Sequence, residues 1–288
     1  METYTPAKLA YRVFEPSTGT DDKLNPVIFL HGVTGAKENW GDIPQTIADG
    51  TKRKAFAVDF RNHGESEYCE VFNFKVNIDD LFHFMDTVNI PKAAIVGHSM
   101  GGITAIGASL KKPERIEMII VEDMFTKTIS QKSCESILDS INMRILLIQS
   151  IPGHLNDTEA IKFLLDTIFT HIPEQNWPFT KTSDLYDMKI PFVRREDGGL
   201  DVKFDKERIR KSLQDSQNLM DEPSGQYHGP AHFLYGSRSS LLVGNEKEHI
   251  KKYFPRAEFF EFENATHYIH MEYPKEFSNK VVHIISKL

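Results

Sequence analysis

The 288-residue sequence has little cysteine and no long apolar run. Its two cysteines, Cys69 and Cys134, have no paired spacing, which argues against a disulfide framework and favours a reducing compartment. No stretch approaches the ~20 apolar residues that a membrane-spanning helix needs. The residues before the first strand-like segment have neither the apolar centre of a signal peptide nor an arginine-rich transit character. We therefore expect an intracellular protein without a stable membrane span.

The sequence also has fewer basic than acidic residues. The chain has 34 lysines and arginines against 41 aspartates and glutamates, which gives a formal net charge of −7. Nucleic acids and anionic membranes favour basic partners, so we expect neither as a ligand. Apolar residues make up 40% and charged residues 26%, as is typical of a globular protein. The length predicts one large domain, or a core domain with an insertion.

The final three residues, Ser286-Lys287-Leu288, match a peroxisomal targeting signal. Leu288 also continues the apolar stripe of the last predicted helix, together with Val281 and Ile284. A leucine buried in that stripe could not be read by an import receptor. Cytoplasmic and peroxisomal locations therefore both stay open.

Apolar runs of strand length alternate with segments of helix length, and this pattern predicts a mainly parallel, doubly wound sheet. The runs are residues 26–30, 55–60, 93–97, 118–121, 231–236 and 257–262. The pattern changes over residues 125–227, where helical segments dominate and no buried strand is obvious. We therefore predict an α/β core formed by residues 1–124 and 228–288, with residues 125–227 inserted as a helical cap.

Residues 97–101, Gly-His-Ser-Met-Gly, fit the pattern G-x-S-x-G. An apolar strand precedes them and a segment of helix length follows, which is the context of a nucleophile elbow. Such a turn would hold Ser99 in a strained conformation, with its hydroxyl exposed above the sheet. An ordinary glycine-rich turn between a strand and a helix is the alternative.

A serine nucleophile needs a base, an acid that orients the base, and two amides that bind the oxyanion. In this fold the histidine follows the last strand, where His267 lies; His270, three residues on, is expected to point elsewhere. Met100, directly after the serine, provides one amide. Val33, which follows His31 and Gly32 after a buried strand, is the expected second donor.

Four motifs resemble those of α/β-hydrolases: residues 31–35, 59–66, 97–102 and 264–267. The sequence Arg-Asn-His-Gly within residues 59–66 resembles a narrower esterase subgroup, that of α/β-hydrolase domain-containing protein eleven and small bacterial acyl esterases. The resemblance covers the core on both sides of the insertion, and the cap only loosely. It implies a serine hydrolase acting on small-molecule carboxylic esters, with acylglycerols and acyl thioesters as candidates, and with no metal or organic cofactor.

The acid departs from the general pattern of the fold. It usually follows the strand after the insertion, but the loop over residues 237–245 has no carboxylate before Glu246. The resembling subgroup has its acid at an earlier strand end, which matches Asp123. The adjacent Glu122 would project to the opposite side if the strand continues. A helix-cap or loop role is the alternative for Asp123.

Two further interpretations stay open. A ligand-binding receptor that keeps the triad but turns over slowly is the alternative to an esterase, and rapid turnover of simple esters would distinguish them. Aromatic residues of the cap either line an acyl pocket or form the cap's own core; they are Phe163, Phe169, Trp177, Phe179 and Phe192. We expect His63 and His83 to be ordinary loop and helix residues. The oligomeric state is not predicted.

Overall fold

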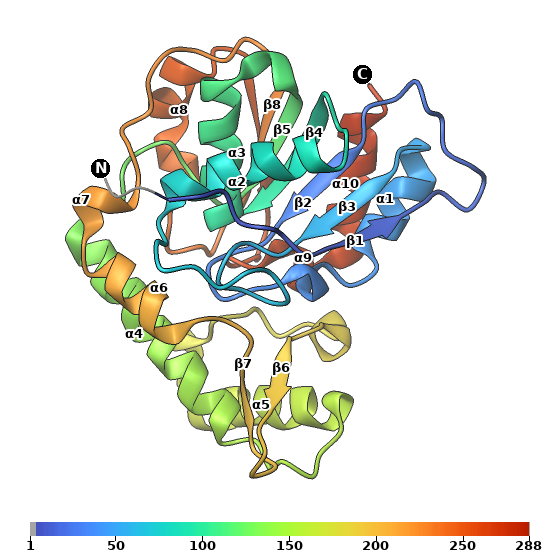
Figure 1. Ribbon diagram of the computed structural model, residues 1–288. Coiled ribbons are helices and arrows are strands. Elements are labelled where there is room, and N and C mark those ends of the chain that lie inside the picture. The colour runs from blue at the N-terminus through green and yellow to red at the C-terminus, as the bar shows by residue number, and fades with distance from the viewer. Residues whose placement is uncertain (1–3, 288) are drawn as a thin grey trace.

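The computed structural model describes residues 4–287 and contains a seven-stranded sheet with the order β1-β3-β2-β4-β5-β8-β9 (Figure 1). Only β1 runs antiparallel to its neighbour; the other pairs are parallel. The strands are β1 (Tyr11–Phe14), β2 (Val27–Leu30), β3 (Ala55–Val58), β4 (Ala93–His98), β5 (Ile116–Glu122), β8 (Ala231–Gly236) and β9 (Ala257–Phe262). The predicted α/β-hydrolase sheet is thus present.

Helices cover both faces of the sheet. One face carries α2 (Phe74–Thr87), α3 (Met100–Lys111) and α8 (Lys247–Tyr253), and the other carries α1 (Ile43–Thr51) and α10 (Pro274–Ile285) (Figure 1). In β2, Ile28 and Leu30 pack on the α2–α3 side, whereas Val27 and Phe29 pack on the α1–α10 side. Because successive strand residues face opposite ways, a strand covered on both faces is apolar throughout.

Most of the segment over residues 125–227 forms a separate layer beyond the carboxyl ends of the strands (Figure 1). Its helices are α4 (Gln131–Gln149), α5 (Asp157–His171), α6 (Lys206–Leu213) and α7 (Ser216–Leu219). Side chains cap the first three: Ser130, Asn156 and Asp205 each accept a hydrogen bond from an amide of the first turn. We propose that this segment is a cap on the core.

The cap also contains a small antiparallel hairpin, β6 (Phe192–Arg194) and β7 (Leu200–Val202), where the sequence predicted only turns and helices. Each strand has three residues and pairs only with the other, so neither produces the long apolar run of a core strand. The helices α6 and α7 follow this hairpin and are separated by Gln214 and Asp215.

The remaining helices are short. They are α9 (Ile269–Glu272) and the 3-10 helices η1 (Lys37–Trp40), η2 (Pro113–Arg115), η3 (Glu174–Asn176), η4 (Asp184–Asp187) and η5 (Val243–Glu246). None of the helices within residues 4–287 is both long and apolar enough to cross a bilayer. Leu288, part of the candidate targeting tripeptide, lies outside the described residues, so that signal stays a prediction.

The strand order reverses beside β4. The chain passes from β2 outward to β3, returns to β4, and then continues to β5 on the other side. At such a switch point the loops leave in opposite directions and open a space at the carboxyl ends of the strands, where ligands bind in α/β proteins. The fold therefore places the end of β4, which is followed by Ser99, at the favoured position for a site.

Candidate active site

The turn after β4 has the tight geometry that the sequence predicted for a nucleophile elbow. Ser99 has φ 52° and ψ −113°, a conformation that is costly for a residue with a side chain. Glycines permit the tight turn: a Cβ on Gly101 would lie 2.1 Å from the Leu30 carbonyl oxygen, and one on Gly97 would lie 2.3 Å from the Gly101 carbonyl oxygen. The Ser99 amide donates to the Glu122 carbonyl at 3.0 Å, which holds the strained residue against β5.

His267 and Asp123 form a hydrogen-bonded pair at the same edge of the sheet. Asp123 follows β5 directly and is fully buried, and its Oδ2 lies 2.7 Å from Nδ1 of His267 in the loop after β9. The Gly236 amide donates to Oδ1 of Asp123 at 3.1 Å, and the Ser239 hydroxyl donates to Oδ2. In this arrangement the Asp123 carboxylate accepts the Nδ1–H of His267, which leaves Nε2 of the ring free to accept a proton.

Ser99 and His267 lie on neighbouring loops, and both are partly exposed. Their side chains form no hydrogen bond within the part of the chain that the structure describes. The backbone of His267 is nevertheless held next to the elbow, because its carbonyl oxygen accepts from Nε2 of His98 at 2.9 Å, and the rings of His98 and His267 pack with their centres 4.7 Å apart. In free enzymes the bond between nucleophile and base is commonly long, and it tightens when substrate binds.

The two amides predicted to bind an oxyanion are available. Neither the Val33 amide nor the Met100 amide donates to a protein acceptor within residues 4–287. The Met100 amide opens helix α3, so it has no acceptor in its own helix and is favoured for binding negative charge. The loops are docked together, since the Gly101 amide donates to the His31 carbonyl at 3.1 Å. This geometry fits an oxyanion hole.

His31 supports the loop that carries Val33. Its Nδ1–H donates to the Gly32 carbonyl at 2.8 Å, and its Nε2 accepts from the Phe60 amide at 3.1 Å. These two partners require the neutral ring, and burial lowers the pKa of His31 to about 3. The histidine therefore acts as a fixed spacer between two strand ends and does not exchange protons near neutral pH.

A second group of buried polar side chains lies beneath the elbow. His270 donates its backbone amide, at 2.9 Å, and its ring Nδ1–H, at 2.8 Å, to one oxygen of Glu122. Burial lowers the pKa of the neighbouring His98 well below its usual range. The ligand atoms of His98, Glu122 and His270 lie within 4.8 Å of one another, so these residues could hold a cation. Their hydrogen bonds instead tie β4 and β5 to the segment after β9: His98 donates to the His267 carbonyl, and Glu122 binds His270 whereas Asp123 binds His267.

The expectation that His63 is an ordinary loop residue is wrong. The side chain is fully buried, and its Nε2 lies 2.7 Å from the carbonyl oxygen of Val33, the proposed oxyanion donor. Nδ1 faces the Arg61 carbonyl at 2.8 Å, and the backbone pairs with Phe204 of the cap. His63 thus links the oxyanion loop to the cap. The only signal in the sequence was its place in the motif over residues 59–66.

The aromatic residues of the cap have different roles. Trp177 packs edge-on against Phe169, with ring centres 4.7 Å apart, and its indole N–H donates to the Ile172 carbonyl, so this pair belongs to the cap's own core. Phe179 is buried and contacts Tyr268, the residue after His267, with ring centres 5.0 Å apart. Of these three aromatic residues, Phe179 is the one that reaches the catalytic loop.

The other candidate acid, Glu246, lies at the start of α8. It forms an ion pair with Lys127 at 2.7 Å and makes no hydrogen bond to His267. A hollow of about 1010 Å³ lies along α2, α3 and the α6–α7 segment, and none of the proposed catalytic residues lines it. The proposed catalytic residues Ser99 and Asp123 thus lie at the carboxyl ends of β4 and β5, and His267 contacts Asp123 from the loop after β9.

The seven-stranded sheet and the serine elbow define the class of α/β-hydrolases. The chain belongs to the alpha/beta hydrolase fold family, whose model matches residues 25–274. This membership confirms the fold predicted from the motifs.

Individual relatives and a solved structure show which members of the family this chain is similar to. The chain is 27% identical over 284 residues to the sn-1-specific diacylglycerol lipase ABHD11 of Danio rerio, a match that covers 98% of this chain and 84% of the relative. It is 27% identical over 300 residues to ethanol acetyltransferase 1 of Kluyveromyces marxianus, covering 95% and 78%. A solved structure described as a marine microorganism esterase has a TM-score of 0.72 and 25% identity, covering 96% of this chain and 99% of that one. The subgroup resemblance is thereby confirmed.

Proposed function

We propose that the protein hydrolyses carboxylic esters through an acyl-enzyme on Ser99. The Asp123–His267 pair at 2.7 Å, held at the edge of the sheet that presents Ser99, is the observation that carries this proposal. As a class of enzyme the protein is a carboxylic ester hydrolase, in line with its lipase and esterase relatives. Acylglycerols and acyl thioesters are the substrate groups that we propose to test first.

In the proposed reaction, Nε2 of His267 takes the proton of the Ser99 hydroxyl while the oxygen attacks the ester carbonyl. The amides of Val33 and Met100 donate to the oxygen that becomes negative in the tetrahedral intermediate. The His267 proton then passes to the departing alkoxide, which leaves as the alcohol. In the second half, His267 takes a proton from water, which attacks the acyl-enzyme. His267 then returns that proton to the Ser99 oxygen as the carboxylic acid leaves. Asp123 keeps the histidine in the required tautomer and stabilises its charged form.

Transfer of the acyl group to an alcohol is a second candidate, because relatives named ethanol acetyltransferase cover most of the chain. The acyl-enzyme would be the same, and an alcohol would replace water in its breakdown. A slow-turnover receptor would also form the acyl-enzyme but would release it rarely.

One experiment distinguishes these functions. Purified protein is incubated with p-nitrophenyl esters from acetate to decanoate, with and without ethanol, and both acid and ethyl ester are quantified. The proposal predicts many turnovers per chain, with the acid as the main product in water. A burst of one equivalent without further turnover would instead identify a receptor, and dominant ethyl ester at low ethanol would identify a transferase.

A further inference from the structure

An arginine of the cap approaches the catalytic loops. Arg144 lies on α4, and its Nη1 donates to the Thr34 hydroxyl at 2.7 Å. Thr34 directly follows Val33, the proposed oxyanion donor. The same guanidinium lies over the ring of Tyr268 at 5.8 Å, one residue after His267. The cation is therefore held between the two loops that carry the oxyanion donor and the base.

Within the described residues, no carboxylate forms an ion pair with this cation. Among residues 4–287, Arg144 forms no ion pair, although the chain has an excess of acidic residues. Its one side-chain hydrogen bond is to a neutral hydroxyl, and the residue is partly exposed, so most of its five N–H donors are free to bind a ligand. By contrast, Arg208 and Arg210 of the same cap pair with carboxylates.

Arg144 is also held in place. The Thr34 hydrogen bond and the Tyr268 ring fix two sides of the guanidinium, and Tyr268 in turn packs against Phe179 of the cap. A planar guanidinium fixed in this way binds a carboxylate or phosphate through two parallel hydrogen bonds, and little side-chain freedom is lost on binding. A neutral ester would leave these donors to water.

From this arrangement we infer that Arg144 is an anion-binding subsite and that the preferred substrates are esters carrying a carboxylate or phosphate near the scissile bond. The inference rests on the proposed ester hydrolysis and names its substrate class. The charged group can belong to the acyl part or to the leaving group, because Arg144 lies beside both the oxyanion loop and the histidine loop.

The test compares charged and neutral esters of matched shape. Mono-p-nitrophenyl adipate and p-nitrophenyl heptanoate place the charge on the acyl side, whereas 4-acetoxybenzoate and p-tolyl acetate place it on the leaving group. The kcat/KM ratio of each charged ester to its neutral partner is measured for the wild type and for Arg144→Met. We expect the wild type to prefer the charged ester of one pair. In Arg144→Met the kcat/KM ratio of that pair should fall by about 10- to 100-fold, as for loss of a charge-assisted hydrogen bond.

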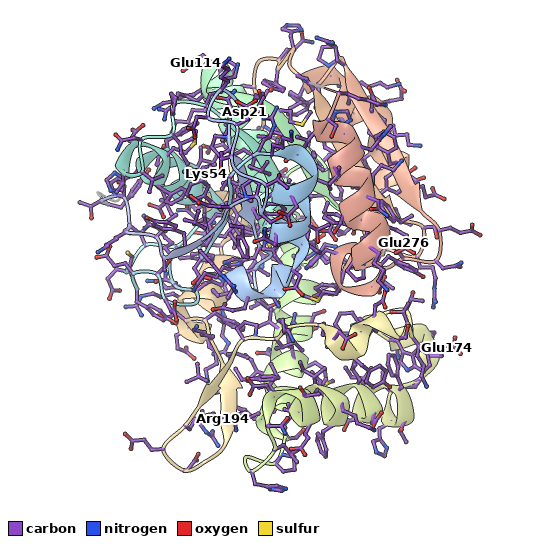
Figure 2. All side chains as sticks on the ribbon, turned by 90° about the vertical axis from the view of Figure 1, so that its right-hand side faces the viewer. Asp21, Lys54, Glu114, Glu174, Arg194 and Glu276 are labelled. Carbon is purple, nitrogen blue, oxygen red and sulfur yellow. The ribbon has the colours of Figure 1, made fainter. Side chains whose placement is uncertain are left out.

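Three further variants separate binding of an anion from a structural role. Thr34→Val removes the hydroxyl that holds Arg144 but keeps the cation, so the preference for the charged ester should fall by less than it does in Arg144→Met. Arg194→Gln removes a cation at the distant end of the cap, on β6, which Figure 2 shows on the cap hairpin away from the core. It should leave the ratios as they are in the wild type. Arg144→Lys should recover part of the preference, since charge without the planar fork binds less well.

The outcomes are distinct for the two proposals. If the wild type turns over neutral esters but shows no preference for either charged ester, the anion subsite is refuted while ester hydrolysis stands. If Arg144→Met lowers kcat/KM equally for charged and neutral partners, the arginine only fastens the cap to the core, and the inference is again wrong. If none of the esters is hydrolysed, the proposed function itself fails.

Discussion

Replacing Asp123 by asparagine should convert His267 into the wrong tautomer, and the surroundings of the carboxylate show why. Oδ1 of Asp123 accepts from the Gly236 amide, which can only donate. In Asp123→Asn the side-chain carbonyl must occupy that position, so the NH₂ group faces Nδ1 of His267. The histidine would then accept at Nδ1 and carry its proton on Nε2, where it can no longer take the proton of Ser99.

The expected loss in kcat is up to ~10⁴-fold, equivalent to about 5.5 kcal/mol of transition-state stabilisation. Hydrolysis of p-nitrophenyl butyrate measures kcat, and circular dichroism checks that the variant is folded. Glu246→Gln is the matched control, because Glu246 is the other carboxylate near a strand end but forms an ion pair with Lys127. That variant should change kcat by no more than a few-fold, since an exposed pair contributes about 1 kcal/mol or less. If Glu246→Gln loses most of its kcat and Asp123→Asn keeps nearly all of it, the assignment of Asp123 as the acid is refuted.

Three other predictions concern stability and specificity. Burial lowers the pKa of His31 from its ordinary value of 6.5 to about 3 in the folded state, so below pH 6.5 the unfolded chain binds a proton that the folded chain does not. As the pH falls below 6.5, this group should lower the free energy of unfolding by up to about 1.4 kcal/mol per pH unit. Urea titrations at pH 7 and 5 should show that this free energy depends less on pH in His31→Gln than in the wild type. An equal pH dependence in the two proteins would contradict the assignment. Asp80→Asn should lower the free energy of unfolding by about 3–5 kcal/mol, because it leaves Arg61 buried without its partner; the partly exposed Asp79→Asn is the control, and equal losses would argue against the buried pair. If the cap limits acyl length, kcat/KM across a chain-length series should peak and then decline, and Phe179→Ala should move the peak to longer chains; a flat series would show that the cap does not shape the site.

The core strands and the tight turn at Ser99 could be predicted because local sequence determines them. A strand buried on both faces must be apolar throughout, and a turn as tight as the one around Ser99 needs glycine at Gly97 and Gly101. The position of Asp123 required more than a local pattern. It depended on the resemblance to a subgroup and on the lack of a carboxylate before Glu246.

The rest depended on contacts between distant segments. The burial of His63 results from its packing against residues 33 and 204, which no local period can reveal. The hairpin β6–β7 is stabilised by pairing between two strands that are too short to produce an apolar run. Arg144 is one cation among many in the sequence, and only the folded cap brings it to Thr34 and Tyr268.

The central claim, that Ser99 is the nucleophile, is tested most directly by locating the covalent adduct of a fluorophosphonate. The protein is treated with the reagent, its intact mass is measured, and the modified peptide is identified by mass spectrometry. We predict one adduct per chain, located on Ser99, together with loss of ester hydrolysis and no labelling of folded Ser99→Ala. An adduct at another residue, or undiminished labelling of Ser99→Ala, would contradict the account.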